Sequence, residues 1–378
     1  MIQLFRNQKI RAQEGARQLE ISPQRFYQLY SGYLRAYAEG RETDWEPGVS
    51  GGDHREEWSK AVIELLNRLL STKPPSSYSF AASEVHRRHG MRLHRATIRR
   101  WALQVGLAHS DYGYRPKAAV RRWQCGEIGA LWQLDASPHR WWQGLKEPLP
   151  LLDILDDCSR VITGTRIYPR ETLLAYFDFL PRVFQEYGLP LALYVDFHSF
   201  FFANQPEVLT ELGKALRFYG ISLRYAPTPQ AKGKIERHHL FWQNRLPAFF
   251  AAEGITEIAE ANHQINLLRQ HHNERETHRE IGMVPQDAWQ KAICEKRSVL
   301  RAVPVCSWWP YVWSHRKIVS VGSDNRVPVG TQRLRIDKAP GSRVVRCLHP
   351  NGNVSYLEAS PDPTKRPVVL LQITSKHL

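Results

Sequence analysis

Between residues 123 and 290, short apolar runs alternate with longer amphipathic segments. Short runs rich in β-branched and aromatic residues predict strands, whereas apolar residues at helical spacing predict helices. The runs predicted as strands are ALWQLDAS, PLPLLDILDD, VITGTRIY, LALYVDF and ISLRYAP. The segments predicted as helices are ETLLAYFDFLPRVFQEYG, PEVLTELGKALRFYG, AKGKIERHHLFWQNRL and ITEIAEANHQINLLRQHHN. Their order predicts an α/β fold in which helices cover a mixed sheet.

Three carboxylates mark these segments. Asp135 lies in the first predicted strand, Asp196 ends the fourth, and Glu236 lies at the start of the helix in PQAKGKIERHH. Phosphodiester cleavage without a covalent intermediate needs an activated oxygen nucleophile and a stabilised leaving oxygen. A pair of Mg²⁺ ions held by carboxylates supplies both. The pattern therefore indicates metal-dependent chemistry on nucleic acid, provided that the strands are neighbours.

Spacing alone does not select these three carboxylates. The run PLLDILDDCSR carries three further ones, which are Asp153, Asp156 and Asp157. A buried carboxylate on a strand is more often a paired structural group than a metal ligand. The residues alone therefore rank Asp135 only modestly above these alternatives.

The net charge of +15 is divided unevenly along the 378 residues. Residues 79–122 and residues 301–378 each carry +8, whereas residues 123–290 carry −4. Basic segments supply affinity for phosphates through counterion release, and an acidic centre suits a cluster of metal-binding carboxylates. A merely basic surface is the alternative, but the segregation of charge favours nucleic-acid binding.

Eight basic side chains are predicted to contact DNA. They are Arg95, Arg99 and Arg100 in HRATIRRWALQVG, Arg121 and Arg122 before the first strand, and Lys232, Lys234 and Arg237 around the start of the helix that carries Glu236. Such side chains hold phosphate oxygens by charge-assisted hydrogen bonds. For Arg237, pairing with a neighbouring carboxylate is an equal alternative.

The N-terminal part of the chain is predicted to form two helical units. Residues 1–40 match a helix-turn-helix pattern, although Glu20 occupies the turn position where glycine is usual. Residues 41–56 are predicted to be a linker, residues 57–108 a second helix-turn-helix domain and residues 109–122 a basic connector. Both units are predicted to bind DNA, while ordinary three-helix packing is the alternative.

After residue 300, short strands separated by turns predict a small β-barrel over 300–362 and a tail over 363–378. The dipeptide Asn351–Gly352, between alternating runs, predicts a hairpin there. No apolar run approaches the roughly 18 residues that span a bilayer. A cytoplasmic, nucleoid-associated protein without a membrane partner is therefore expected.

The cysteines argue against a disulfide framework and against a thiolate zinc site. All five are scattered, and no CxxC pair is present. The paired histidines His238–His239 and His271–His272 have no cysteine partners nearby in the sequence. They are accordingly predicted to be DNA-facing or helix-surface groups.

The motifs between residues 123 and 290 occur in an order that resembles the DDE transposase and retroviral integrase superfamily, in its insertion-sequence branch. The ordered set is LWQLDAS, LLDILDDCSRVITG, LYVDFHSFF, PTPQAKGKIER and HNERETHREIGMVPQDAW. Each motif alone is weak, and their order makes the set specific. Two departures are that Phe197 follows Asp196, where relatives often carry a basic or polar residue, and that the HHCC zinc module of retroviral integrases is absent.

The resemblance implies an RNase H-like catalytic core over 123–292, flanked by DNA-binding helical domains and a β-barrel. The catalytic and metal-binding triad that it implies is Asp135, Asp196 and Glu236. It also implies two Mg²⁺ ions, with Mn²⁺ as a substitute. By the same resemblance, Asp157 and Ser159 are not metal ligands.

The function implied is that of a DDE transposase, a polynucleotidyl transferase that binds transposon ends and catalyses DNA cleavage and strand transfer. Its partners would be double-stranded DNA of the ends and of the target, on which it would act as a homo-oligomer, with the need for a helper ATPase left open. One alternative is a catalytically silent DNA-binding regulator or architectural protein derived from a transposase. Another is a nuclease that hydrolyses without joining. The presence of all three acidic residues favours the enzyme over the silent protein.

Overall fold

The computed structural model describes eight segments of the chain. They are residues 1–41, 45–46, 57–109, 124–196, 210–226, 233–305, 309–359 and 367–375. Most of the predicted linker and connector lie outside these residues, as do Arg121, Arg122 and Lys232. The chain divides into two compact units, Met1–Ser59 and Lys60–Leu378, which are described separately. None of the described helices is long and apolar enough to cross a membrane.

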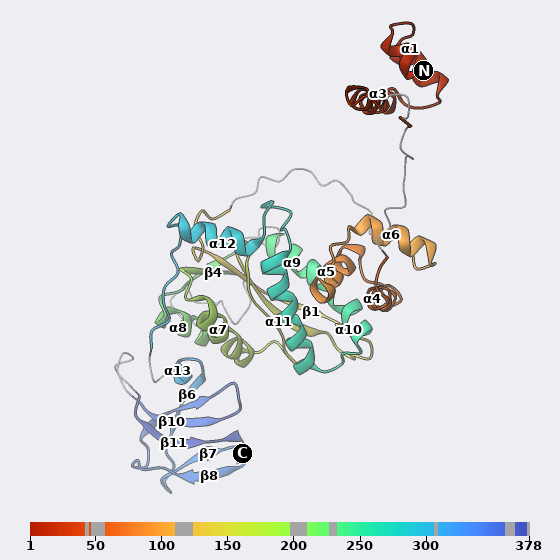
Figure 1. The fold of residues 1–378 in the computed structure, drawn as a ribbon. Helices are drawn as coiled ribbons and strands as arrows, with labels where there is room; N and C mark the ends of the chain where they lie inside the picture. The colour runs from red at the N-terminus through yellow and green to blue at the C-terminus, as the bar shows by residue number, and fades with distance from the viewer. Residues whose placement is uncertain are drawn as a thin grey trace. The chain divides into compact units, whose positions relative to one another are not determined.

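The first unit contains three helices, which are α1 (Ile2–Arg6), α2 (Ala12–Gln18) and α3 (Pro23–Ala38) (Figure 1). Helix α3 begins after Ser22, whose hydroxyl accepts a hydrogen bond from the backbone N–H of Arg25 at 3.2 Å. Phe26 is fully buried and packs on Ala12 and Ala16. The helices expected in residues 1–40 are therefore present, and DNA binding by this unit stays a prediction.

Glu20, between α2 and α3, has a left-handed backbone conformation with φ of 53°. A side chain is disfavoured in this region, whereas glycine adopts it without a steric cost. We expect Glu20→Gly to slow hydrogen exchange of the α2 and α3 amides, through a gain in local stability of about 0.5–1 kcal/mol. Glu14→Gly, inside α2, is the matched control and should accelerate exchange. Faster exchange in Glu20→Gly would contradict the strain at this turn.

The second unit begins with three helices in the region of the second predicted helix-turn-helix domain. They are α4 (Lys60–Leu70), α5 (Tyr78–His89) and α6 (Arg95–Gln104). In α6, Ile98 and Ala102 are fully buried. Phe80 of α5 packs edge-on against Phe249 at 5.9 Å, and Arg88 lies 3.1 Å from Glu253. These helices therefore pack against the domain that follows.

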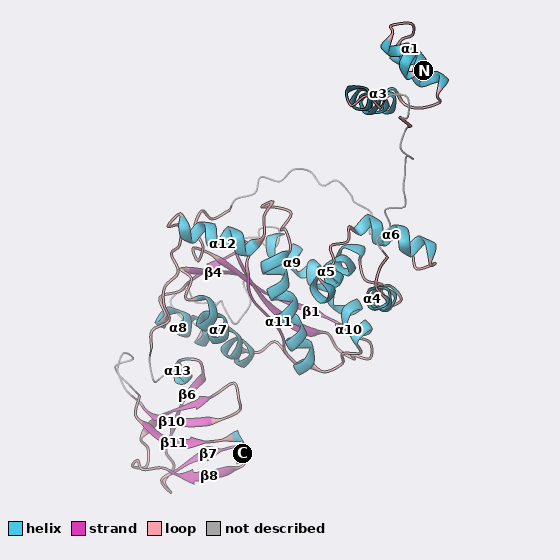
Figure 2. Ribbon diagram, viewed as in Figure 1, coloured by secondary structure: helices cyan, strands magenta, loops and turns pink. Residues whose placement is uncertain are grey.

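A five-stranded mixed sheet forms the centre of the second unit (Figure 2). Its strands are β1 (Trp132–His139), β2 (Leu149–Asp156), β3 (Ile162–Ile167), β4 (Ala192–Val195) and β5 (Ser222–Tyr225). Their order is β3-β2-β1-β4-β5, in which β1, β2 and β3 are antiparallel and β4 and β5 run parallel to β1. The predicted mixed α/β fold is confirmed.

Alternate residues of β1 face different helices. Trp132 and Leu134 lie in the main core, which α7 (Leu173–Tyr187) and α8 (Glu211–Phe218) complete on one face. The other face of β1 contacts α9 (Gly233–Gln243). The helices that follow are α10 (Leu246–Glu253), α11 (Ile258–Arg275) and α12 (Pro285–Cys294). The sheet is therefore covered on both faces, and β1 lies at its centre.

Helix α11 protects the edge strand β3 with side-chain amides. Asn262 exchanges hydrogen bonds with the N–H and C=O of Ile167 at 2.7 and 2.9 Å. Asn273 does the same for Ile162 at 3.0 and 2.9 Å. Arg269, between them, donates to the carbonyl of Ile162 at 3.1 Å. These contacts satisfy backbone groups that an edge strand would otherwise leave unpaired.

The C-terminal part begins with the short helix α13 (Trp309–Val312). Trp313 follows it and stacks on Tyr219 of the main core, with ring centroids 5.6 Å apart. A four-stranded antiparallel sheet has the order β11-β10-β9-β6. Its strands are β6 (His315–Ser320), β9 (Arg343–Leu348), β10 (Val354–Glu358) and β11 (Val369–Ile373). The remaining strands, β7 (Arg326–Val329) and β8 (Gln332–Arg335), pair only with each other.

The predicted closed barrel is not formed by the described residues. The ladders give two separate sheets with a shared core, because β7 and β8 join neither edge of the larger sheet. The hairpin at Asn351–Gly352 is confirmed, since Leu348 pairs with Val354 and Gly352 has φ of 81°. Strand β11 lies within the segment predicted as a tail.

Candidate active site on the sheet and helix α9

Two of the predicted carboxylates lie at the same end of neighbouring strands. The parallel register of β1 and β4 sets Gln133 opposite Tyr194. Continued by two residues, this register places Asp196, which directly follows β4, beside Asp135. Burial raises the pKa of Tyr176 in α7 well above its usual value, and Glu171, followed by Asp135 and Asp196, raises it further. Both Asp135 and Asp196 therefore act electrostatically on the same phenol.

Helix α9 lies along β1 and carries the third predicted carboxylate. The amide Nε2 of Gln243 donates to Oγ of Ser137 at 2.9 Å, and Nδ1 of His239 lies 3.6 Å from Oδ2 of Asp135. Glu236 precedes His239 by three residues, so the two share a flank of the helix. Glu236 is exposed and lies on the flank of α9 that carries His239, one turn nearer the start of the helix.

The chemistry of these side chains fits a hard divalent cation, because Mg²⁺ is held by carboxylate oxygens. Asp135 is 18% exposed and Glu236 is exposed, so neither carboxylate is sealed in the core. Among the residues that the structure describes, however, no group of three or more His, Cys, Asp or Glu side chains is placed to hold a metal ion. Continuing the register of β1 and β4 by two residues brings Asp196 level with Asp135, while Glu236 lies on the adjacent helix α9. The metal-binding triad stays a prediction.

Asp153 forms a buried pair, as expected of a carboxylate on a strand, and its partner is His238. Asp153 lies opposite Asp135 in the register of β1 and β2 and is completely buried. Its carboxylate accepts a hydrogen bond from Oγ1 of Thr165 at 2.5 Å and forms an ion pair with Nδ1 of His238. Burial opposes ionisation of Asp153, but His238, together with His239 and Thr165, outweighs it and lowers the pKa of Asp153.

His238 and His239 face the sheet, so their prediction as helix-surface groups is wrong. Each is only 8% exposed. Ile235 and Trp242, which are fully buried, lie on the same side of α9 and turn both histidines inward. The apolar residues at positions 235 and 242 were the signal in the sequence, because their seven-residue spacing marks a buried stripe.

Asp156 is a structural carboxylate in the turn from β2 to β3. It accepts hydrogen bonds from the N–H of Gly129 at 2.9 Å and the indole of Trp132 at 3.0 Å. The backbone N–H and hydroxyl of Ser159 donate to its second oxygen at 2.7 and 2.8 Å. Burial raises the pKa of Asp156 despite these donors. These contacts hold the turn between β2 and β3 in place and give Asp156 and Ser159 a structural role.

Asp157 is also held by protein donors. It accepts from the N–H of Cys125 at 2.8 Å, from Nε2 of Gln133 at 2.7 Å and from Nζ of Lys234 at 2.5 Å. Burial lowers the pKa of Lys234, against the opposing effect of Asp157. Lys234 therefore ties the start of α9 to the β2–β3 turn. Its contact with a DNA phosphate stays a prediction.

Arg237 is half-exposed and has a carboxylate neighbour. Its Nε donates to the carbonyl of Gly233 at 2.8 Å, and Nη2 lies 3.7 Å from Glu280. Pairing with a carboxylate, the alternative that the sequence left open, is thus observed. Three further predicted DNA contacts, Arg95, Arg99 and Arg100, are exposed on α6. DNA binding by all of these side chains stays a prediction.

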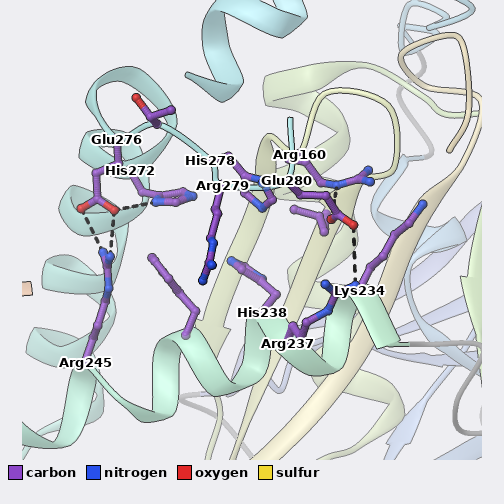
Figure 3. Close-up of a pocket in the computed structure, with 13 residues that line it drawn as sticks. Arg160, Lys234, Arg237, His238, Arg245, His272, Glu276, His278, Arg279 and Glu280 are labelled. Carbon is purple, nitrogen blue, oxygen red and sulfur yellow. Dashed lines mark hydrogen bonds and ion pairs between the residues drawn. The ribbon is translucent and has the colours of Figure 1, made fainter. Parts of the chain in front are cut away.

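A cavity of about 710 Å³ lies beside α9 (Figure 3), and Glu236 is not among the residues that line it. Its lining joins three of the sequence motifs: Arg160 comes from DDCSR, Lys234 and Arg237 come from GKIER, and residues 276–280 come from HNERETHRE. Nε of Arg160 lies 3.4 Å from Glu280. The motifs that carried the resemblance therefore meet in space.

Glu276 ties several helices together at this cavity. Arg245, which directly precedes α10, donates two hydrogen bonds of 2.9 Å to its carboxylate, and Nδ1 of His272 in α11 lies 2.9 Å away. The hydroxyl of Ser83 in α5 also donates to it. Burial opposes ionisation, but Arg245 and His272 outweigh it and hold the pKa of Glu276 well below its usual value of 4.5.

We expect Glu276→Gln to destabilise the second unit by about 2 kcal/mol at pH 7, because a buried charge-assisted network loses its anion. A carboxylate with a lowered folded pKa stabilises the fold above its unfolded pKa, and this stabilisation is lost as the pH falls through the folded pKa. The difference from wild type should therefore shrink below pH 4.5. Urea denaturation at several pH values measures this difference in the free energy of unfolding, and the exposed Glu274→Gln is the control. A difference that stays constant with pH would contradict the ion pair.

The chain thus contains a mixed α/β domain, and sequence comparisons show which proteins the chain is similar to. No protein-family model matches the sequence. The chain is 28% identical over 234 residues to the candidate transposase y4bF of Sinorhizobium fredii, which covers 58% of this chain and 50% of the relative. It is 34% identical over 141 residues to the transposase for insertion sequence IS1202 of Streptococcus pneumoniae, which covers 35% of this chain and 30% of the relative.

Both relatives are named as transposases, so the matches bear out the resemblance to transposases. The chain spans half the length, or less, of these curated relatives. Among solved structures, the catalytic core of BIV integrase covers 44% of this chain and 98% of its own length, at 20% identity and a TM-score of 0.35. The match to the simian T-cell lymphotropic virus intasome in complex with a PP2A regulatory subunit covers 78% of this chain and 98% of that chain. The identity is 15% and the TM-score is 0.38.

Proposed function

We propose that this chain is a transposase of the DDE type, a metal-dependent polynucleotidyl transferase that binds transposon ends, cleaves them and joins them to target DNA. The observation that carries the proposal is the parallel register of β1 and β4, which brings Asp196 level with Asp135 when it is continued by two residues. Helix α9 supports it, because Glu236 lies on the flank along β1. The names of the two transposases to which the chain is similar point to the same function.

In this proposal Asp135, Asp196 and Glu236 hold two Mg²⁺ ions, for which Mn²⁺ can substitute. When bound, the ions would activate the attacking oxygen and stabilise the leaving oxygen. The solved HTLV-2 integrase core, described in complex with magnesium, supports this choice of metal. Water attacks the phosphodiester at the transposon end, and the freed 3′-hydroxyl then attacks the target strand. No Ser or Tyr nucleophile of the chain takes part.

The flanking parts of the chain would hold the DNA. The helices of residues 1–40 and 57–108 are proposed to act as helix-turn-helix domains, with Arg95, Arg99 and Arg100 exposed on α6 for phosphate contacts. The basic C-terminal strands would add affinity for the backbone. We further propose that the chain acts as a homo-oligomer on DNA, in the cytoplasm and at the nucleoid.

A strand-transfer assay tests the function. The full chain is incubated with Mg²⁺, DNA that carries the element's ends and a target plasmid. The expected products are nicks at the ends, followed by joined molecules with short target duplications. Cutting without joining would instead assign a hydrolytic nuclease. End binding without any cutting would assign a silent regulator.

A further inference from the structure

The cavity beside α9 is not used by the proposed chemistry. Lys234, His238 and Phe241 line it from α9 at spacings of three and four residues, which form one stripe. At about 100° per residue, Glu236 lies on roughly the opposite flank of the helix. The cavity therefore lies along one face of α9, and the predicted catalytic residue Glu236 lies on another.

The lining of this cavity is rich in positive charge. Five cationic side chains, Arg160, Lys234, Arg237, Arg245 and Arg279, face two carboxylates, Glu276 and Glu280. Both carboxylates already have cationic partners in the protein. Even when Lys234 is counted with its partner Asp157, a formal excess of two positive charges remains. Such a concave basic surface favours an anion.

His238 adds a buried polar atom without a protein partner. Its Nδ1 faces Asp153, while Nε2 is buried and has no hydrogen-bond partner among the described residues. Buried polar atoms nearly always have partners, so Nε2 is left for a group other than the described residues. Figure 3 shows His238 and Arg279 pointing into the same space.

The aromatic residue in the lining is not free to stack on a base. The guanidinium of Arg245 lies 3.7 Å from the ring centroid of Phe241. His238 stacks near this ring, with centroids 5.4 Å apart and an interplanar angle of 21°. The cavity thus offers positive charge and hydrogen-bond donors but no open aromatic face, which selects a phosphate over a nucleobase.

We propose that this cavity binds a phosphate group of a DNA backbone, on the flank of α9 away from the predicted catalytic carboxylates. Arg237 and Arg279 donate to the phosphate oxygens from the rim. The inference rests on the proposed function, because it places the DNA strand across α9.

Inorganic phosphate tests the cavity without any cleavage. The Tm of the full chain is measured in phosphate and in chloride of equal ionic strength. The variants are Arg279→Gln and Thr277→Glu, both exposed at the cavity, and the control is the exposed Arg275→Gln outside its lining. Phosphate should raise the Tm of wild type and Arg275→Gln more than that of the two cavity variants. Equal shifts in all four proteins would overturn the site.

A second arm identifies the source of the phosphate. Binding to a mixed-sequence duplex with 5′-hydroxyl ends is measured over a range of salt concentrations. Loss of one phosphate contact should make the slope of log K against log salt shallower by about 0.9 in Arg279→Gln, but not in Arg275→Gln. If the slopes of wild type and Arg279→Gln are equal while phosphate still raises the Tm, the cavity binds free phosphate. The proposal that it binds a phosphate of DNA is then overturned. Both arms measure binding alone, so a failure of strand transfer does not affect them.

Discussion

Asp135→Asn, Asp196→Asn and Glu236→Gln are each expected to lower the rates of Mg²⁺-dependent cleavage and strand transfer by at least about 10³-fold, or about 4 kcal/mol in activation free energy. Each substitution replaces a charged oxygen ligand by a neutral amide of the same shape. The three carboxylates belong to different elements, β1, the end of β4 and α9, so a shared loss would show that they act at one site.

The control for these variants is Asp287→Asn, an equivalent change on the exposed side of α12. It should retain wild-type rates. End binding by all four variants, measured without metal, separates a loss of chemistry from a loss of DNA affinity. Strand transfer that survives any one of the three site substitutions would remove that residue from the proposed triad.

Asn273→Leu is expected to lower the free energy of unfolding of the second unit by about 2–5 kcal/mol. The side chain is 3% exposed and satisfies both backbone groups of Ile162 on the edge strand β3. Leucine has a similar volume but leaves a buried N–H unpaired and weakens the pairing of the carbonyl, at a cost of about 1–3 kcal/mol for each group.

Urea denaturation of the full chain measures this loss. Gln270→Leu, on the exposed side of the same helix, is the control and should change stability by less than about 0.5 kcal/mol. Similar stabilities of Asn273→Leu and wild type would mean that water replaces the amide at the edge of β3.

The sequence predicted the central fold well, because each strand between residues 132 and 225 is a short apolar run bounded by turns. The division of the C-terminal strands into two separate sheets was not predictable in the same way. Whether β7 and β8 join the sheet of β9 and β10 or pair with each other depends on long-range pairing, which local alternation does not encode. The edge amides Asn262 and Asn273 gave no local signal either, since their partners are more than 90 residues away.

The candidate site was predictable in its residues but not in its surroundings. Motif order selected Asp135, Asp196 and Glu236, whereas the residues alone ranked Asp135 only modestly above Asp153. The buried pair of Asp153 and His238 depends on α9 packing across β2, a tertiary contact that the sequence does not specify. The burial of His238 and His239, in contrast, was signalled by the seven-residue spacing of Ile235 and Trp242.

Mn²⁺ binding to the full chain, followed by electron paramagnetic resonance, tests most directly whether the three carboxylates form one metal site. The expected result is that wild type and Asp287→Asn bind Mn²⁺ with the same affinity. Asp135→Asn, Asp196→Asn and Glu236→Gln should each weaken binding by at least about tenfold, since each removes a charged oxygen ligand. Unchanged Mn²⁺ affinity in these three variants would contradict the proposed active site.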